Sequence, residues 1–447
     1  MMKLTQQHVQ HLLMRIGFGD QLDVVNAYRG QPASKILKDQ FKESRSVRRI
    51  QVKSDLNTTA FKTMTKEEKQ QMRMDQRSKI AELNSLWIKE MVQSDSGINE
   101  KLAFFWHDHF ACKSNRVDFM QSYLQTIRQH ALGNFGDLLR AVSKTPAMLQ
   151  YLNNQQNKKS APNENFAREV MELFTLGLDN GYSEQDISEA ARAFTGWGFT
   201  REGAFVERTR THDFGQKTFF GKKGAFKGDD ILDMLLENKQ TANYISEKWV
   251  AYFVNYKGDS RLQAEVANAL YASNYDIKTG LTALFTSQAF FNKENIGSRI
   301  KSPIELIVGL QRQLQVAITD EQSLLFLQKA LGQTLFDPPN VAGWPDGKGW
   351  IDSASLMFRL RLPELVFKAA VIQNHPTRSF DDNDQFALRG KLKKITIDFD
   401  LEQLERSFAK DAIGEFLIQG NTERDQPELA FLDQIVYFTS KPEYQLC

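Results

Sequence analysis

The chain has 447 residues, enough for one large helical domain or roughly two to three smaller ones. Its net charge of +2 provides no strong field for nucleic acid, its two cysteines form no disulfide framework, and it contains no apolar run long enough to span a membrane. The first residues lack a signal-peptide pattern, which predicts a cytoplasmic protein; removal of an export signal before residue 1 would instead place it in the periplasm or outside the cell.

Hydrophobic residues recur at helical spacing along most of the chain, so we expect a mainly α-helical fold. Residues 1–95 form a predicted N-terminal helical region, in which Val9, Leu12, Leu13 and Ile16 share one face. Residues 96–375 are the predicted helical core. Residues 376–447, which include a short strand expected at 394–399, form a predicted C-terminal helical extension packed on that core.

In the stretch KLAFFWHDHFACKSN, residues 101–110 are too apolar and aromatic to be exposed, although they carry His107, Asp108 and His109. Buried imidazoles need partners. Two helical residues two positions apart point about 200° away from each other, so both histidines can face one centre only where the helix ends. Each of the two histidines is either a core residue whose hydrogen bonds are satisfied by the protein or a metal ligand.

Residues 163–197 predict two helices joined by a glycine turn. Glu169 and Glu172 lie on one stripe of the first helix, and Arg168 is placed to pair with Glu172. Ser183 followed by Asp186 predicts the start of the second helix. The charged side of this hairpin is either a solvated ion-pair network or an acidic site for a cation or for acid–base chemistry.

Residues 199–221 lack a helical period and predict a short β-hairpin excursion, which contains His212, Asp213 and Lys217. Further helices follow it. Residues 331–352 then form a loop stiffened by prolines and carrying Trp344 and Trp350. Exposed tryptophans are costly, so this loop is either packed over the core or forms a lid beside a cleft.

Five stretches together carry a resemblance: FWHDHF, NENFAREVMELFTLG with GYSEQDISEAARAFTGW, HDFGQKTFFG, KSPIELIVGLQR and PPNVAGWP. Over nearly the whole chain, the sequence resembles the bacterial family catalogued as domain of unknown function 1800. The resemblance implies a helical fold, a frequently exported protein, and a partner protein with an alkaline phosphatase or sulfatase-like fold. Phe174 departs from the pattern, because many relatives carry histidine there. The family's motif positions map onto Trp106, His107, His109, Asn165, Arg168, Glu169, Glu172, Trp197, His212, Asp213 and Lys217.

Two functions follow as hypotheses. The first is an enzyme of unresolved hydrolase or oxidoreductase type, acting on a small-molecule or polymer substrate in an acidic, histidine-bearing cleft and using a divalent metal. The second is a non-catalytic scaffold or partner protein, in which the charged hairpin is a structural polar network. The enzyme hypothesis assigns catalysis to Glu169, Glu172, His212 and Asp213, metal binding to His107, His109 and Glu169, and substrate binding to Arg168, Lys217, Trp106, Trp197 and Trp344.

Overall fold

The computed structural model describes residues 2–44, 46–54, 64–95, 97–368, 395, 397–408, 412–419 and 428–447. Helices dominate these residues, which confirms the mainly α-helical fold. The expected strand at 394–399 is seen as Ile397–Asp398, and Lys394 lies outside the described residues.

The first half of the chain contains α1 (Gln6–Ile16), α2 (Leu22–Tyr28), α3 (Ala33–Glu43), α4 (Lys66–Gln93), α5 (Gly97–His109), α6 (Val117–His130), α7 (Phe135–Ser143), α8 (Pro146–Tyr151), α9 (Asn165–Glu169), the π-helix η3 (Val170–Thr175) and α10 (Glu184–Ala193). The second half contains α11 (Gly228–Glu237), α12 (Lys239–Phe253), α13 (Ser260–Ala272), α14 (Ile277–Thr286), α15 (Pro303–Gln313), α16 (Glu321–Leu331), α17 (Ser353–Lys368), α19 (Leu401–Ser407), α20 (Ala412–Leu417) and α21 (Phe431–Thr439). Short 3₁₀ turns are η2 (Asn154–Gln156), η4 (Ala289–Phe291), η5 (Lys293–Asn295), η6 (Gly347–Trp350) and η7 (Pro442–Gln445).

The predicted β excursion is confirmed, and it consists of two antiparallel hairpins. Strands β1 (Trp197–Phe199) and β2 (Phe205–Glu207) pair with Gly198 opposite Val206, whereas β3 (Lys217–Phe219) and β4 (Lys222–Gly224) pair with Thr218 opposite Lys223. A third pair joins β5 (Ala317–Ile318) to β6 (Ile397–Asp398).

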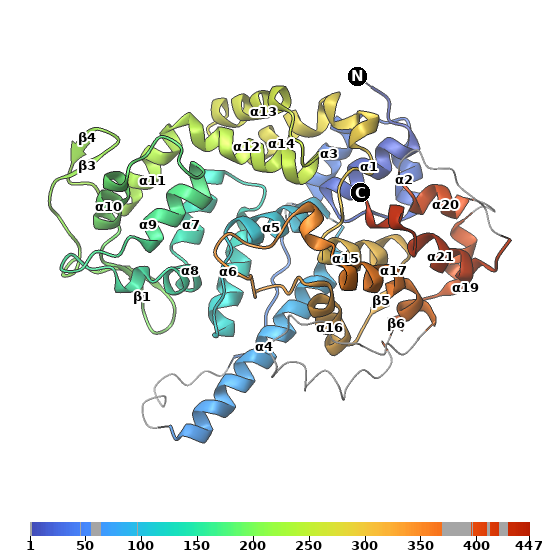
Figure 1. The fold of residues 1–447 in the computed structure, drawn as a ribbon, viewed down its shortest axis with the longest axis horizontal. Coiled ribbons are helices and arrows are strands. Elements are labelled where there is room, and N and C mark those ends of the chain that lie inside the picture. The colour runs from blue at the N-terminus through green and yellow to red at the C-terminus, as the bar shows by residue number, and fades with distance from the viewer. Residues whose placement is uncertain are drawn as a thin grey trace.

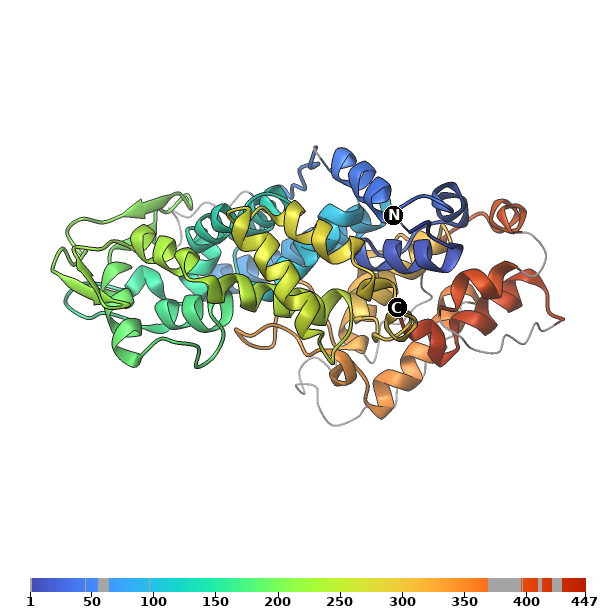
Figure 2. The same cartoon turned by 90° about the horizontal axis from the view of Figure 1, so that it is seen from above.

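The molecule is elongated (Figures 1 and 2). The hairpins and α7 to α11 lie at one end, and the C-terminal helices α19 to α21 lie at the other. Helix α5 runs through the middle, and the N-terminal half of α4 projects away from the body. One hydrophobic core extends from Leu4 to Tyr444, and the division into three domains stays a prediction.

Helix α5 is buried on nearly every side, as its apolar sequence predicts. Its start lies against the end of α1. A Cβ on Gly97 would lie 3.2 Å from the Cα of Gly17, a tight contact, so this close approach of the two backbones favours glycine. The central position of α5 places its C-terminal residues among α12, η3 and the 331–352 loop.

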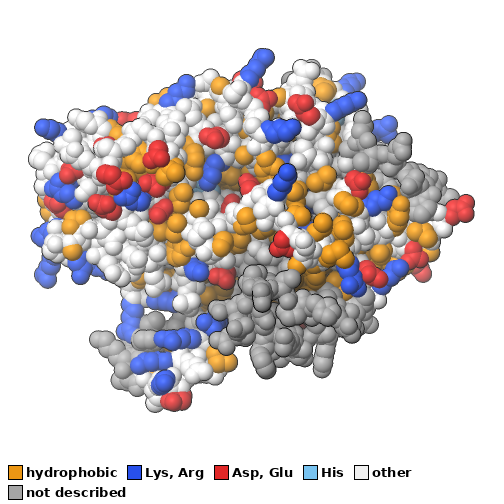
Figure 3. Space-filling model, in the orientation of Figure 1, with side chains coloured by type: hydrophobic (Ala, Val, Ile, Leu, Met, Phe, Trp, Pro, Cys, Tyr) orange, Lys and Arg blue, Asp and Glu red, His pale blue; other side chains and the backbone are white. Residues whose placement is uncertain are grey.

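Acidic and basic side chains are interspersed over the face shown in Figure 3, and Lys and Arg side chains gather on the projecting part of α4. The mixed signs agree with the small net charge of the sequence. Among the described helices, none combines the length and the apolar character needed to cross a bilayer.

Candidate functional site

His107 is held as a neutral core residue. Its Nε2 accepts a hydrogen bond from the backbone N–H of Phe336 at 3.1 Å, so the proton is on Nδ1, which lies 3.3 Å from the Tyr123 hydroxyl. That hydroxyl donates in turn to the carbonyl of Phe110 at 2.6 Å. Burial lowers the pKa of His107 to about 3. Both ring nitrogens are therefore occupied by protein groups.

His109 lies at the end of α5 between two other elements. Its Nε2 donates to the carbonyl of Phe174 at 3.1 Å, which leaves Nδ1 as an acceptor 3.2 Å from the Nζ of Lys248 on α12. Burial, and then the charge of Lys248, lower the pKa of His109 well below its usual value. A neutral imidazole thus connects the π-helix to a lysine ammonium.

The helix that the sequence predicts over residues 163–177 ends in a wider turn than expected. The N–H of Leu176 donates to the carbonyl of Met171 at 2.8 Å, the spacing of a π-helix, and Gly177 then adopts a φ of +85°. Carbonyl groups in the last turn of a helix lack intrahelical partners. The carbonyl of Phe174 is one of these groups, and His109 satisfies it.

Asp108 faces the 331–352 loop. Its Oδ1 accepts from the backbone N–H of Trp344 at 2.9 Å. A Cβ on Gly343 would lie 2.2 Å from the same oxygen, and Gly343 has a φ of +90°, so this position needs glycine. The FWHDHF and PPNVAGWP stretches therefore meet at one carboxylate.

Asp108 and Lys248 are both partly buried, and in the described part of the chain no cation lies within 4 Å of the Asp108 carboxylate. Burial raises the pKa of Asp108 to about 6, an effect that its bond from Trp344 and the charge of Lys248 reduce. Burial also lowers the pKa of Lys248, and Asp108 partly offsets that change. The two side chains thus feel each other's charge without forming a close ion pair.

Tyr252 lies one helical turn beyond Lys248 on α12. Its hydroxyl is buried and has no hydrogen-bond partner within the residues that the structure describes. Burial raises its pKa well above the usual value. The charge of Glu305 raises this pKa further, the charge of Arg299 opposes that rise, and the charge of Asp108 adds a smaller one. We define Asp108, His109, Lys248 and Tyr252 as the α5–α12 site.

The charged side chains of the predicted acidic hairpin form an ion-pair network instead of joining this site. The predicted pair of Arg168 and Glu172 is confirmed at 3.2 Å, and Arg168 also contacts Glu164 at 3.5 Å and Glu184 at 2.7 Å. Glu169 is partly buried, and burial together with the charge of Glu172 raises its pKa.

The predicted residues of the β excursion fasten that segment to α10. Asp213 accepts from Arg192 at 2.8 Å, and Lys217 donates to the carbonyls of Asp213 at 2.5 Å and Gly215 at 3.1 Å. The Nδ1 of His212 donates to the carbonyl of Thr195 at 2.8 Å, and its buried Nε2 has no partner among the described groups.

Two of the predicted tryptophans adjoin the α5–α12 site, and the third lies under the hairpins. Trp106 is fully buried, its indole N–H donates to the carbonyl of Ala131 at 3.1 Å, and its ring centroid lies 5.5 Å from that of His109. Trp197 packs between Phe194 and Phe205 under the hairpins. The backbone N–H of Trp344 donates to Asp108 of the α5–α12 site, and the ring centroid of Trp344 lies 5.2 Å from that of His107.

Within the described chain, no hydrogen bond, ion pair or ring contact links His107, His109, Glu169 and His212 to one another. Across all the residues that the structure describes, there is no cluster of three or more His, Cys, Asp or Glu side chains that could hold a metal ion. The structure brings Trp106, His107, His109 and Trp344 into one region. It leaves Glu169 and His212 in two other networks, and their functional roles stay predictions.

The sequence interpretation did not select Asp108, Lys248 or Tyr252. Lys248 could have been noticed because Tyr244, Lys248 and Tyr252 follow one another at helical spacing beside the apolar face of α12.

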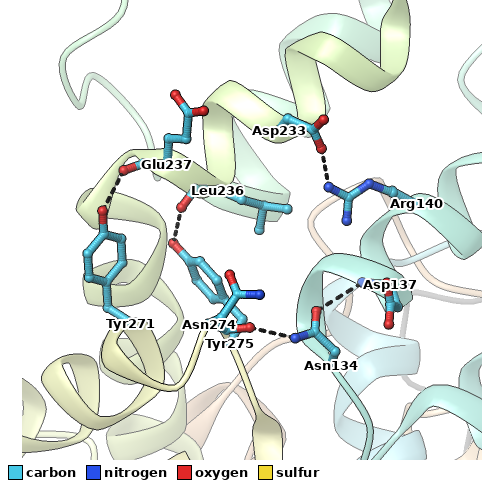
Figure 4. Close-up of a pocket in the computed structure, with 9 residues that line it drawn as sticks. All are labelled: Asn134, Asp137, Arg140, Asp233, Leu236, Glu237, Tyr271, Asn274 and Tyr275. Carbon is cyan, nitrogen blue, oxygen red and sulfur yellow. Dashed lines mark hydrogen bonds and ion pairs between the residues drawn. The ribbon is translucent and has the colours of Figure 1, made fainter.

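A surface pocket of about 620 Å³ lies elsewhere, between α7, α11 and the end of α13 (Figure 4). Its polar groups bond to neighbouring protein groups: Tyr271 donates to Glu237 at 2.9 Å, Tyr275 donates to Leu236 at 2.8 Å, and Arg140 pairs with Asp233. No predicted site residue lines this pocket, and its side chains are occupied in holding the helices together.

The fold and site define a mainly α-helical protein with a partly buried Asp–Lys–His arrangement at the end of its central helix. The family model described as "Protein of unknown function (DUF1800)" matches residues 11–446. The chain therefore belongs to this family, as the resemblance implied, and it is an uncharacterised protein of unassigned activity. No curated protein and no solved structure matched it.

Proposed function

We propose that this chain is an enzyme that carries out acid–base chemistry on a small molecule at the α5–α12 site. Asp108 is the proton-accepting group, and Lys248 is the proton donor or the cation that holds a developing negative charge. The observation that carries this proposal is the partly buried carboxylate of Asp108, which has no close cation although an amine with a lowered pKa lies beside it. General acids and bases work best when their pKa lies near the working pH.

The surroundings support this role. His109 binds Lys248 through an uncharged acceptor at 3.2 Å, so the ammonium is oriented without being neutralised. Tyr252 adds a hydroxyl that no described protein group satisfies. A carboxylate without a close cation and a hydroxyl without a hydrogen-bond partner among the described groups can bind the polar group of a substrate, because buried polar groups require partners.

A structural role for the predicted acidic hairpin is the second candidate, and the network around α10 favours it. Glu189 accepts from the backbone N–H of Thr218 at 2.8 Å, and Asp186 accepts from that of Phe220 at 2.9 Å. Arg192 connects Glu189 to Asp213. These bonds fix the register of the excursion against the helix. Under this second candidate function, the residues predicted to be catalytic form a polar network that holds the excursion on the helix, and the protein is a non-catalytic scaffold.

Competitive acetylation followed by mass spectrometry tests the electrostatics of the site. We expect Lys248 to titrate below the usual lysine value, and Asp108→Asn to lower the pKa of Lys248 further, because the charge of Asp108 raises it. Glu247→Gln is the matched control, since Glu247 also raises this pKa but contributes less. A Lys248 that titrates with the exposed lysines in all three proteins contradicts the proposal.

The enzymatic step is tested by screening hydrolysis and isomerisation substrates. Turnover is expected to be lost in Asp108→Asn and Lys248→Met and kept in Glu247→Gln. Equal turnover in all of these variants would exclude the α5–α12 site as the catalytic centre. A fold that collapses on Asp213→Asn, with no substrate found, would favour the scaffold.

Two open expectations accompany this proposal: a location that is cytoplasmic as the sequence reads or exported if a signal was removed, and a partner with an alkaline phosphatase or sulfatase-like fold. Affinity purification of the tagged chain from its own cells tests the second. One stoichiometric partner of that fold supports the second prediction, and cell fractionation separates an exported protein from a cytoplasmic one.

A further inference from the structure

A second polar cluster lies where α1, α5, α15 and α17 meet the last residues of the chain. Its charged side chains are almost completely enclosed: Glu305 is 1% exposed, and every cation around it is 2% exposed or less. We call this cluster the cation junction. Its cations are Arg15, Lys101, Arg299, Lys301 and Arg359.

Short contacts show that these groups are neighbours. Lys101 pairs with Glu305, and Arg299 lies 3.9 Å from the same carboxylate. Arg359 donates to the carbonyl of Lys301 at 2.9 Å. Arg15 donates to the carbonyl oxygen of Cys447 at 2.6 Å, which agrees with the position of the chain end beside α1 in Figures 1 and 2.

Positive charge exceeds negative charge at the junction. Among the described residues, Glu305 is the one buried carboxylate side chain facing five buried cations. Asp346 lies 3.7 Å from Arg299 but its side chain is 62% exposed, and negative charge at Cys447 acts on Arg15, Lys101, Arg299 and Lys301. Burial lowers the pKa of Lys301 to about 8 and that of Arg15 to about 10. Uncompensated buried charge is strongly unfavourable, so an additional anion would stabilise this arrangement.

Hydrogen-bond donors also exceed acceptors. Five guanidinium nitrogens are buried and have no partner among the described groups: Nε and Nη1 of Arg15, Nε of Arg299, and Nε and Nη2 of Arg359. The side-chain amide of Gln445 is unpartnered as well. Oxyanions accept several charge-assisted hydrogen bonds at once, and arginine is suited to bind them.

From the excess charge and the unused donors together, we infer that the cation junction is a binding site for a small oxyanion of the phosphate or sulfate class. The enclosure of the side chains favours a free inorganic ion over a group carried on a larger molecule. The inference goes beyond the proposed enzyme, because the bound ion would join the N-terminal helix to the last residues of the chain and does not require Asp108 or Lys248.

Titration calorimetry of desalted protein with inorganic phosphate, at constant pH and ionic strength, tests the inference. We expect saturable binding and a rise in melting temperature of about 2–5 °C at saturation. Arg359→Gln should weaken binding at least tenfold. The matched control Arg261→Gln, which removes a guanidinium that is 90% exposed, should change it less than twofold. Sulfate in place of phosphate distinguishes the two ions.

Hydrogen exchange of the unsubstituted protein keeps the test decisive if Arg359→Gln does not fold. Phosphate should slow exchange in residues 295–301 and 442–447 and leave the hairpins at 197–224 unchanged. Absence of saturable heat, or protection spread evenly over the surface, overturns the inference. Asp108→Asn is expected to bind phosphate like the parent, so failure of the enzyme proposal and failure of the anion site are separate results.

Discussion

The Nδ1 of His109 and the Nζ of Lys248 lie 3.2 Å apart, although 139 positions separate the two residues in the sequence. Lys248 is the donor in this hydrogen bond. The reason is that Nε2 of His109 donates to the carbonyl of Phe174, which leaves Nδ1 unprotonated. His109 therefore stays neutral while it holds a cation. This relationship places a lysine with a lowered pKa beside the Asp108 carboxylate and gives the α5–α12 site its proposed chemistry.

Asp108→Asn should stabilise the protein above pH 6. The pKa of Asp108 is raised to about 6 in the folded state, so the folded protein binds this proton more tightly than the unfolded chain does. The free energy of unfolding of the parent should consequently fall by about 1–3 kcal/mol as pH rises from about 4 to about 6. Asp108→Asn, which has no carboxylate at this position, should lack that fall. Urea unfolding from pH 4 to 8 measures it. Asp337→Asn, which changes an exposed carboxylate, is the control, and a loss of stability in Asp108→Asn alone would argue for a structural role.

His107→Phe should destabilise the protein by about 2–4 kcal/mol, because the N–H of Phe336 and the hydroxyl of Tyr123 each lose a partner. The pKa of His107 is about 3 in the folded state against 6.5 ordinarily. Its contribution is fully present above pH 6.5 and is lost as pH falls from 6.5 toward 3, because only the unfolded chain then takes up the proton.

Denaturation of His107→Phe across this pH range tests both effects, and His130→Phe provides a control on the same type of residue. His130 is partly buried and lies outside the aromatic cluster around His107. Equal stability of the two variants at neutral pH would contradict the structural assignment of His107.

Local signals in the sequence predicted much of the fold. Ser183 and Asp186 form the expected capping box of α10, and Gly177 ends the preceding helix at the expected glycine turn. Each of these features depends on residues a few positions apart. The pattern of neighbouring residues is sufficient to specify them.

The site could not be predicted in the same way, because its contacts join distant segments. The apolar run in α5 indicates that His107 and His109 are buried, but the partners of their nitrogens are backbone groups and a lysine from other elements. Asp213 illustrates a different difficulty. An Asp and an Arg are residue types common in catalytic sites, but here the ion pair of Asp213 with Arg192 attaches a hairpin to a helix. The sequence reveals the polar residues and their helix faces, whereas the packing of those faces decides their roles.

Glu169→Gln should leave the metal content of the purified protein unchanged. Glu169 belongs to the region of Arg168 and Glu172, and neither imidazole of α5 shares a hydrogen bond or an ion pair with it in the described structure. Elemental analysis by mass spectrometry, at equal protein concentration and after identical desalting, checks this expectation. A stoichiometric divalent metal in the parent that disappears in both Glu169→Gln and His109→Gln would instead support the metal-dependent enzyme with His107, His109 and Glu169 as ligands.

Gly343→Ala separates two effects that coincide at the meeting point of α5 and the 331–352 loop. The added Cβ would lie 2.2 Å from Oδ1 of Asp108 and 2.8 Å from the Asp108 carbonyl oxygen, and the φ of +90° is itself unfavourable for alanine. Gly332 has nearly the same φ of +88°, but a Cβ there would have no atom within 4 Å. Gly332→Ala should therefore cost about 1–2 kcal/mol of stability from backbone strain alone, and Gly343→Ala about 2–4 kcal/mol more. Chemical denaturation measures that excess.

Because the loop must move away from Asp108, Gly343→Ala should also shift the acetylation profile of Lys248, whereas Gly332→Ala should not. Equal costs in the two variants, with an unchanged Lys248 profile, would show that Gly343 does not position the carboxylate.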